Sequence, residues 1–202
     1  LGLRFQPDLV LLCYVLNDPE TRSQTYPALL PSEIGNRMLW SRALYVTRAA
    51  AYYVMLAMGR LPRQDDYIRG LFEPHSPNWQ AHVEALRGIV ADSRAAGLEV
   101  LAAVWPLPGP VHGFSPYPYA AIQAQAVHTL EAAGAITFDL LPVFSGDRYS
   151  EFALSSWDPH PNPAANRRAA FAIRAQIDAL GLGPGATGGE GGIRPAPGAP
   201  RR

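Results

Sequence analysis

The strongest constraint on the fold is a set of three short apolar runs separated by segments with helical periodicity. The runs cover residues 8–16, 98–105 and 135–141, and Pro or Gly stands at the ends of each of them. Runs this short are typical of strands that are buried on both faces rather than of buried helices. Cys13, inside the first run, is therefore expected to be a buried core thiol.

Helical patterns lie between and after these runs. Apolar residues recur at helical spacing over 79–90, 119–133 and 163–180, with Asn78 and Asn162 as the expected N-caps of the first and last of these helices. Strands that alternate with helices predict parallel strands joined by right-handed crossovers, with helices on both faces. We therefore expect an α/β protein with a three-layer α/β/α sandwich of flavodoxin-like type.

The 202 residues suggest one domain over residues 1–180. Residues 19–77 hold too much sequence for a simple crossover and are expected to form a helical insertion. This insertion is either a helical pair packed on the core or a lid or acyl-chain surface beside the site. Residues 181–202 are rich in Gly and Pro and have almost no large apolar side chain, which predicts a disordered tail.

The composition excludes several classes of function. Seventeen basic residues balance seventeen acidic ones, so the net charge provides no general attraction to nucleic acid. The chain contains no Lys, which excludes a P-loop lysine and a Schiff-base lysine. The single Cys13 excludes internal disulfides and a Cys-based zinc site. No apolar run is long enough to predict a transmembrane segment, and the sequence leaves the localisation open.

Polar residues at the carboxyl ends of the expected strands are candidates for a site, because ligands of parallel α/β sheets bind there. Asn17 and Asp18 follow the first run, and His112 lies in the Pro-rich loop after the second. Asn17 either turns the chain or donates its amide to an oxyanion. Asp18 and His112 are either ordinary loop residues or contacts of a substrate.

The segment Asp158-Pro159-His160 is the most informative one in the chain. Prolines on both sides stiffen the backbone around His160, which suits a general base that must hold its imidazole in place. The following helix N-terminus favours the neutral ring, and Asp158 can orient the ring and stabilise the imidazolium. We expect the Asp158 carboxylate to approach a ring nitrogen while Asn162 caps the helix. The alternative is an ordinary Pro-rich helix entry with an exposed His.

Two segments in this order resemble conserved blocks of the SGNH/GDSL hydrolases. Residues 5–18, a hydrophobic strand that leads into Asn17-Asp18, resemble the third block, and residues 158–163 resemble the fifth, which carries the catalytic Asp and His. The resemblance covers about residues 3–180. It implies a flavodoxin-like fold without a cofactor and a lipid, glycan or small-molecule ester as substrate. It assigns Asn17 to the oxyanion, His160 to the base and Asp158 to its orientation.

The sequence also departs from this family. The Gly-Asp-Ser motif with the nucleophile is absent, since Gly146-Asp147 is followed by Arg148, and the seven residues before Asp8 leave no room for it. Ser155 and Ser156 are too close to His160 in sequence to replace it. We therefore expect the N-terminal strand with the nucleophile to lie outside these residues, the strand at 8–16 to have an open edge, and this chain to be inactive alone.

Two further departures from the family leave other functions open. Val15 stands where the family often has Gly, and only Pro159 separates the Asp from the His where two residues are usual. The chain is alternatively a non-catalytic α/β binding module, a degenerate relative of the hydrolases. A weaker alternative is a metal-dependent phosphoesterase that uses Asp18, His112, Asp158 and His160.

Overall fold

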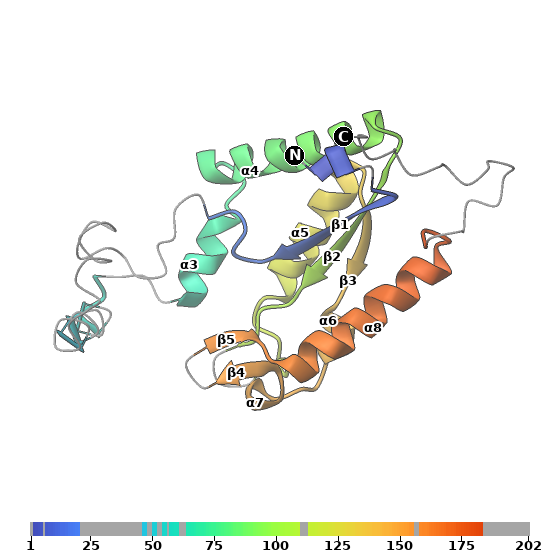
Figure 1. Ribbon diagram of the computed structural model, residues 1–202. Coiled ribbons are helices and arrows are strands. Elements are labelled where there is room, and N and C mark those ends of the chain that lie inside the picture. Colours follow the sequence, from blue (N-terminus) through green and yellow to red (C-terminus); the bar gives the residue numbers. More distant parts are fainter. Residues whose placement is uncertain are drawn as a thin grey trace, which may run out of the picture.

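The computed structural model describes residues 2–5, 7–20, 64–109, 113–155 and 158–183, together with some positions between 46 and 60 (Figure 1). Much of the helical insertion expected over 19–77 and most of the expected tail at 181–202 lie outside the described residues. In chain order the elements are η1 (Gly2–Phe5), β1 (Leu9–Val15), α3 (Gln64–Leu71), α4 (Pro77–Ala95), β2 (Glu99–Trp105), α5 (Ala120–Ala133), β3 (Ile136–Asp139), α6 (Leu141–Phe144), α7 (Tyr149–Phe152), β4 (Ala153–Ser155), β5 (Asp158–Pro161) and α8 (Pro163–Ala179).

The three apolar runs form one parallel sheet in the order β1-β2-β3. Leu9 of β1 lies opposite Glu99 of β2, and Leu101 of β2 lies opposite Ile136 of β3. Because parallel neighbours need a crossover, α4 lies between β1 and β2 in the chain and α5 lies between β2 and β3. The predicted α/β class with a parallel sheet is confirmed.

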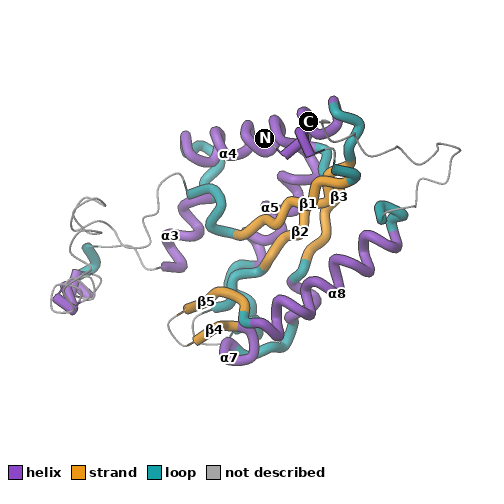
Figure 2. Tube along the Cα trace, viewed as in Figure 1, coloured by secondary structure: helices purple, strands orange, loops and turns teal. Residues whose placement is uncertain are grey.

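Helices cover the two faces of the sheet with separate apolar clusters. On one face, Tyr14 packs with residues of α4 and α5 such as Leu86 and Leu130. On the other face, Ala103 of β2 packs with residues such as Ala169 of α8. Figure 2 shows the strands between α4 and α8, so the molecule has helices on both sides of the sheet.

β1 is buried on one face only, and the expectation that it is covered on both faces is wrong. Its side chains that point toward α4 and α5 include the fully buried Tyr14. On the opposite face, Leu11 is 42% exposed and Cys13 is exposed, so the expectation of a core thiol is also wrong. The reason is that the cluster under α8 includes residues of β2 and β3 but none of β1.

Among the described residues, nothing pairs with the outer edge of β1 along most of its length. In the described part of the chain, β1 pairs only with β2. At the carboxyl end, the Val15 N–H donates to the Asp18 carboxylate at 2.9 Å and the Asp18 N–H donates to the Val15 carbonyl at 2.9 Å. Backbone groups of alternate residues point to the same edge, so those of Leu9, Leu11 and Cys13 face outward like those of Val15. The open edge expected over 8–16 is thus present among the described residues.

Part of the insertion is packed on the core beside the carboxyl end of the sheet. Buried Ile68 of α3 joins the apolar cluster on the α4–α5 face. The Tyr67 hydroxyl donates to the Glu20 carboxylate at 2.7 Å, and Arg69 donates to the Pro118 carbonyl at 2.6 Å. α3 therefore joins the loop after β1 to the loop after β2. Among the described residues, no helix is long and apolar enough to cross a membrane.

The start of α4 differs from the sequence expectation. The N-cap is Ser76, whose hydroxyl accepts the Trp79 N–H at 3.1 Å, and not Asn78. Pro77 then occupies the first helical turn, where its missing N–H breaks no helical hydrogen bond. The last helix begins as predicted, with Asn162 as its N-cap and Pro163 as its first residue.

Candidate functional site

The Asp158-Pro159-His160 segment lies on a β-hairpin that the sequence did not predict. β4 and β5 pair antiparallel, with Ala153 opposite Pro161 and Ser155 opposite Asp158. Prolines are tolerated here because a two-stranded hairpin has free edges where no N–H is required. Figure 1 shows the hairpin beyond the carboxyl ends of β2 and β3, on the side of the sheet where β1 also ends.

Asp158 and His160 are in direct contact despite the single residue between them. The Asp158 Oδ1 lies 2.6 Å from the His160 Nδ1 and also accepts the His160 backbone N–H at 3.0 Å. Both bonds lower the pKa of Asp158 below its usual value, and the bond from the backbone N–H has the larger effect. The carboxylate therefore stays charged at neutral pH, so that it acts as an acceptor for the ring N–H. The expected contact is present, and its catalytic role stays a prediction.

The second ring nitrogen of His160 is available to a reactant. The His160 side chain is 79% exposed, and among the described residues its ring bonds only to Asp158. With the proton of the neutral ring on Nδ1, the lone pair of Nε2 can accept a proton from a hydroxyl. A histidine held in this way has the geometry that a general base requires.

The cap of α8 leaves Asp158 free for this contact. The Asn162 Oδ1 accepts the N–H groups of Ala164 and Ala165, both at 2.9 Å. Asp158 is thus not needed at the helix start, and the two roles are divided as the sequence predicted.

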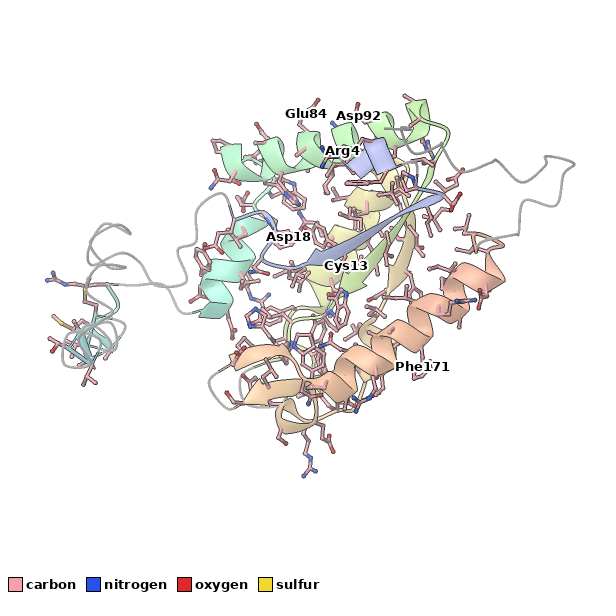
Figure 3. The ribbon with its side chains drawn as sticks, viewed as in Figure 1. Arg4, Cys13, Asp18, Glu84, Asp92 and Phe171 are labelled. Atoms are coloured by element: carbon pink, nitrogen blue, oxygen red, sulfur yellow. The ribbon has the colours of Figure 1, made fainter. Side chains whose placement is uncertain are left out.

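Asn17 and Asp18 lie together at the carboxyl end of β1, where Figure 3 shows Asp18. Asn17 is exposed, and its carbonyl accepts the Glu20 N–H at 3.0 Å, so the turn predicted from the sequence is present. No described hydrogen bond engages the Asn17 side chain, which leaves its amide available as a donor. Asp18 instead closes the end of β1 through Val15. Burial raises the pKa of Asp18, and the bond from the Val15 N–H partly offsets that rise.

The structure thus brings together only some of the predicted site residues. Asp158 and His160 touch, whereas Asn17 and Asp18 lie at the same end of the sheet without a described contact to them. His112 lies outside the described residues. Within the described ranges, no three His, Cys, Asp or Glu side chains are grouped so that they could hold a metal ion.

A polar network below the site was missed by the sequence reasoning. The Gln123 side chain of α5 is fully buried and donates to the Asp139 Oδ1 at 2.7 Å. That oxygen also accepts the Leu141 N–H at 2.9 Å, and the Tyr117 hydroxyl donates to the Gln123 Oε1 at 3.2 Å. The network joins the loops after β2 and β3. Its signal in the sequence was an amide in the apolar periodicity of α5, beside Ile122.

Comparisons of this chain with models of protein families, with curated proteins and with solved structures gave no match. The functional assignment therefore depends on the residues and their geometry.

Proposed function

We propose that this chain carries the Asn, Asp and His of a serine ester hydrolase or acyltransferase of SGNH/GDSL type with a flavodoxin-like fold. The observation that supports the proposal most is the contact between Asp158 and His160 at 2.6 Å, at the carboxyl end of a parallel sheet. Asn17 stands at the same end, two residues after the last residue of β1. The order of these residues and their place on the sheet are those that the resemblance implies.

In the proposed reaction, His160 accepts the proton of a serine hydroxyl on its Nε2. The serine oxygen attacks the ester carbonyl, and the electron pair of the C=O bond moves onto the oxygen, where the Asn17 amide and backbone N–H groups stabilise the charge. Asp158 stabilises the imidazolium that has formed. His160 then returns the proton to the departing alcohol, and water or another hydroxyl releases the acyl group by the same steps.

The serine itself is proposed to come from outside these residues, because no Gly-Asp-Ser occurs in the chain. The open edge of β1 offers backbone groups at Leu9, Leu11 and Cys13 to a further strand. A parallel strand at this edge would end beside Asn17, at the same end of the sheet as the hairpin. The open edge thus supports a place for the nucleophile next to the oxyanion donor.

The absence of the same motif favours a second candidate, a non-catalytic α/β module that uses this end of the sheet to bind a ligand. In that case the pair of Asp158 and His160 recognises a hydroxyl or an anion without a nucleophile. The two functions differ in one measurable property, which is His160-dependent turnover.

The test compares the 202-residue chain with the longest protein product of its gene, using short acyl nitrophenyl esters. The longest product is expected to hydrolyse the esters and the 202-residue chain is not. His160→Ala should lower turnover by at least about 100-fold, the contribution of a general base. His75→Ala is the matched control, since His75 is exposed and lies before α4, away from the hairpin. Absent turnover would favour the binding module, and turnover that survives His160→Ala would contradict the proposed role of His160.

A further inference from the structure

Asn162 makes more hydrogen bonds than a helix cap requires. Its Oδ1 accepts the two N–H groups at the start of α8, which is the ordinary capping role. Its Nδ2 also donates to the Glu151 carbonyl at 2.9 Å and, at 3.4 Å, to the Ala153 carbonyl. Its backbone N–H donates to the Phe152 carbonyl at 2.7 Å. One residue therefore joins the start of α8 to the segment where α7 passes into β4.

This connection lies two residues after His160 and replaces hydrogen bonds that β5 lacks. Pro159 and Pro161 have no N–H, so half of the four residues of β5 have nothing to donate to β4. The Asn166 side chain adds a bond from α8 to the Pro161 carbonyl at 2.9 Å. The carboxyl side of His160 is thus held mainly by asparagine side chains.

Among the described residues, side-chain packing gives the position of His160 little support. Its side chain is 79% exposed and that of Asp158 is 46% exposed, so packing does not fix either of them. The contact between the two sets their mutual geometry but not the course of the hairpin that carries them. An exposed ring on a short hairpin keeps one orientation only when the backbone below it is held.

We propose that Asn162 is a positioning residue for His160. Its Oδ1 caps α8, while its Nδ2 holds β5 on the α7–β4 segment and so keeps the backbone of residues 158–160 in the shape that the contact with Asp158 needs. The catalytic meaning of this role rests on the proposed function, whereas the role itself can be measured without any turnover.

The central variant is Asn162→Ser. Serine retains an acceptor for the helix cap but is too short to donate to the Glu151 and Ala153 carbonyls. NMR on the folded chain measures two quantities: the tautomer of the His160 ring from its ¹⁵N shifts, and the hydrogen exchange rate of the amide at position 162. We expect the wild type to be mainly the Nδ1–H tautomer. In Asn162→Ser the fraction of this tautomer should fall, and the amide should exchange at least about tenfold faster.

Ser76→Ala is the matched control, because it removes the N-cap of α4 and leaves the hairpin intact. It should leave both quantities unchanged. If Asn162→Ser accelerates exchange but leaves the tautomer unchanged, Asn162 is only structural and the proposal is wrong. If neither quantity changes, the proposal is also wrong.

Asn166→Ala provides a second variant if Asn162→Ser does not fold, since it removes only the bond to the Pro161 carbonyl. It should shift the tautomer in the same direction, and an unchanged tautomer would again contradict the proposal. A tautomer shift in the folded chain, together with a longest gene product that shows no esterase activity, would contradict the proposed function while the positioning role stands.

Discussion

Replacing Gly113 by Ala should destabilise the protein through two separable effects. Gly113 has φ +62°, in the left-handed region that residues with a Cβ rarely adopt. A Cβ at this position would lie 2.6 Å from the Asp147 carbonyl oxygen and 2.6 Å from the Tyr149 nitrogen. Both atoms belong to the backbone at the start of α7, so they cannot move away as the end of a flexible side chain could.

The magnitude follows from these two observations. The left-handed conformation costs about 1–2 kcal/mol for a residue with a Cβ. Forcing extra volume against packed backbone costs about 1–3 kcal/mol more. Gly113→Ala should therefore lower the free energy of unfolding by about 2–5 kcal/mol. Gly146→Ala is the matched control, because Gly146 has φ +89° but no atom within 4 Å of the added Cβ, and it should show only the first effect.

Urea unfolding of the two variants and the wild type, followed by circular dichroism, measures the difference. Gly113→Ala should be less stable than Gly146→Ala by about 1–3 kcal/mol, the contribution of the contact with the backbone. Equal losses in the two variants would show that the loop after β2 can move away from α7. The inference that this loop is fixed against the start of α7 would then be wrong.

The fold could be predicted from the sequence wherever local signals agreed. The apolar runs bounded by Pro or Gly predicted the three strands of the sheet, because burial and turn chemistry both act within a few residues. Asn162 and Pro163 predicted the start of α8 for the same reason. At α4 two polar residues competed for the cap, and Ser76 was selected because Pro77 fits best in the first turn.

The exposure of β1 could not be predicted, because the length of an apolar run does not show how many faces are covered. The side of β1 that carries Leu11 and Cys13 depends on where α8 lies, and α8 is more than a hundred residues away in the chain. The hairpin was missed because its prolines argue against a strand in a large sheet. In the site, the contact of Asp158 with His160 could be predicted because prolines stiffen the backbone on both sides of His160. The bond of Asp18 to the Val15 N–H could not be predicted, because it depends on β1 lying at the edge of the sheet.

Two further predictions address the site and the edge of the sheet. An NMR titration should give Asp158 a pKa below its ordinary value of 3.8, and His160→Ala should restore it only partly, because the larger cause, the backbone N–H of residue 160, remains. The stabilisation from these bonds is complete above the ordinary pKa and is lost as the pH falls through the lowered one; an Asp158 pKa above 3.8 would contradict the contact. At the edge, Leu11→Lys should reduce self-association at high concentration in light scattering, because a charge on an open strand opposes pairing with another chain. Leu11 is 42% exposed, so its stability should change by no more than about 0.5 kcal/mol. Phe171→Lys, on the exposed side of α8 in Figure 3, removes a more exposed apolar side chain away from the edge. If it reduces association as much as Leu11→Lys does, general hydrophobicity and not the free backbone of β1 drives the association.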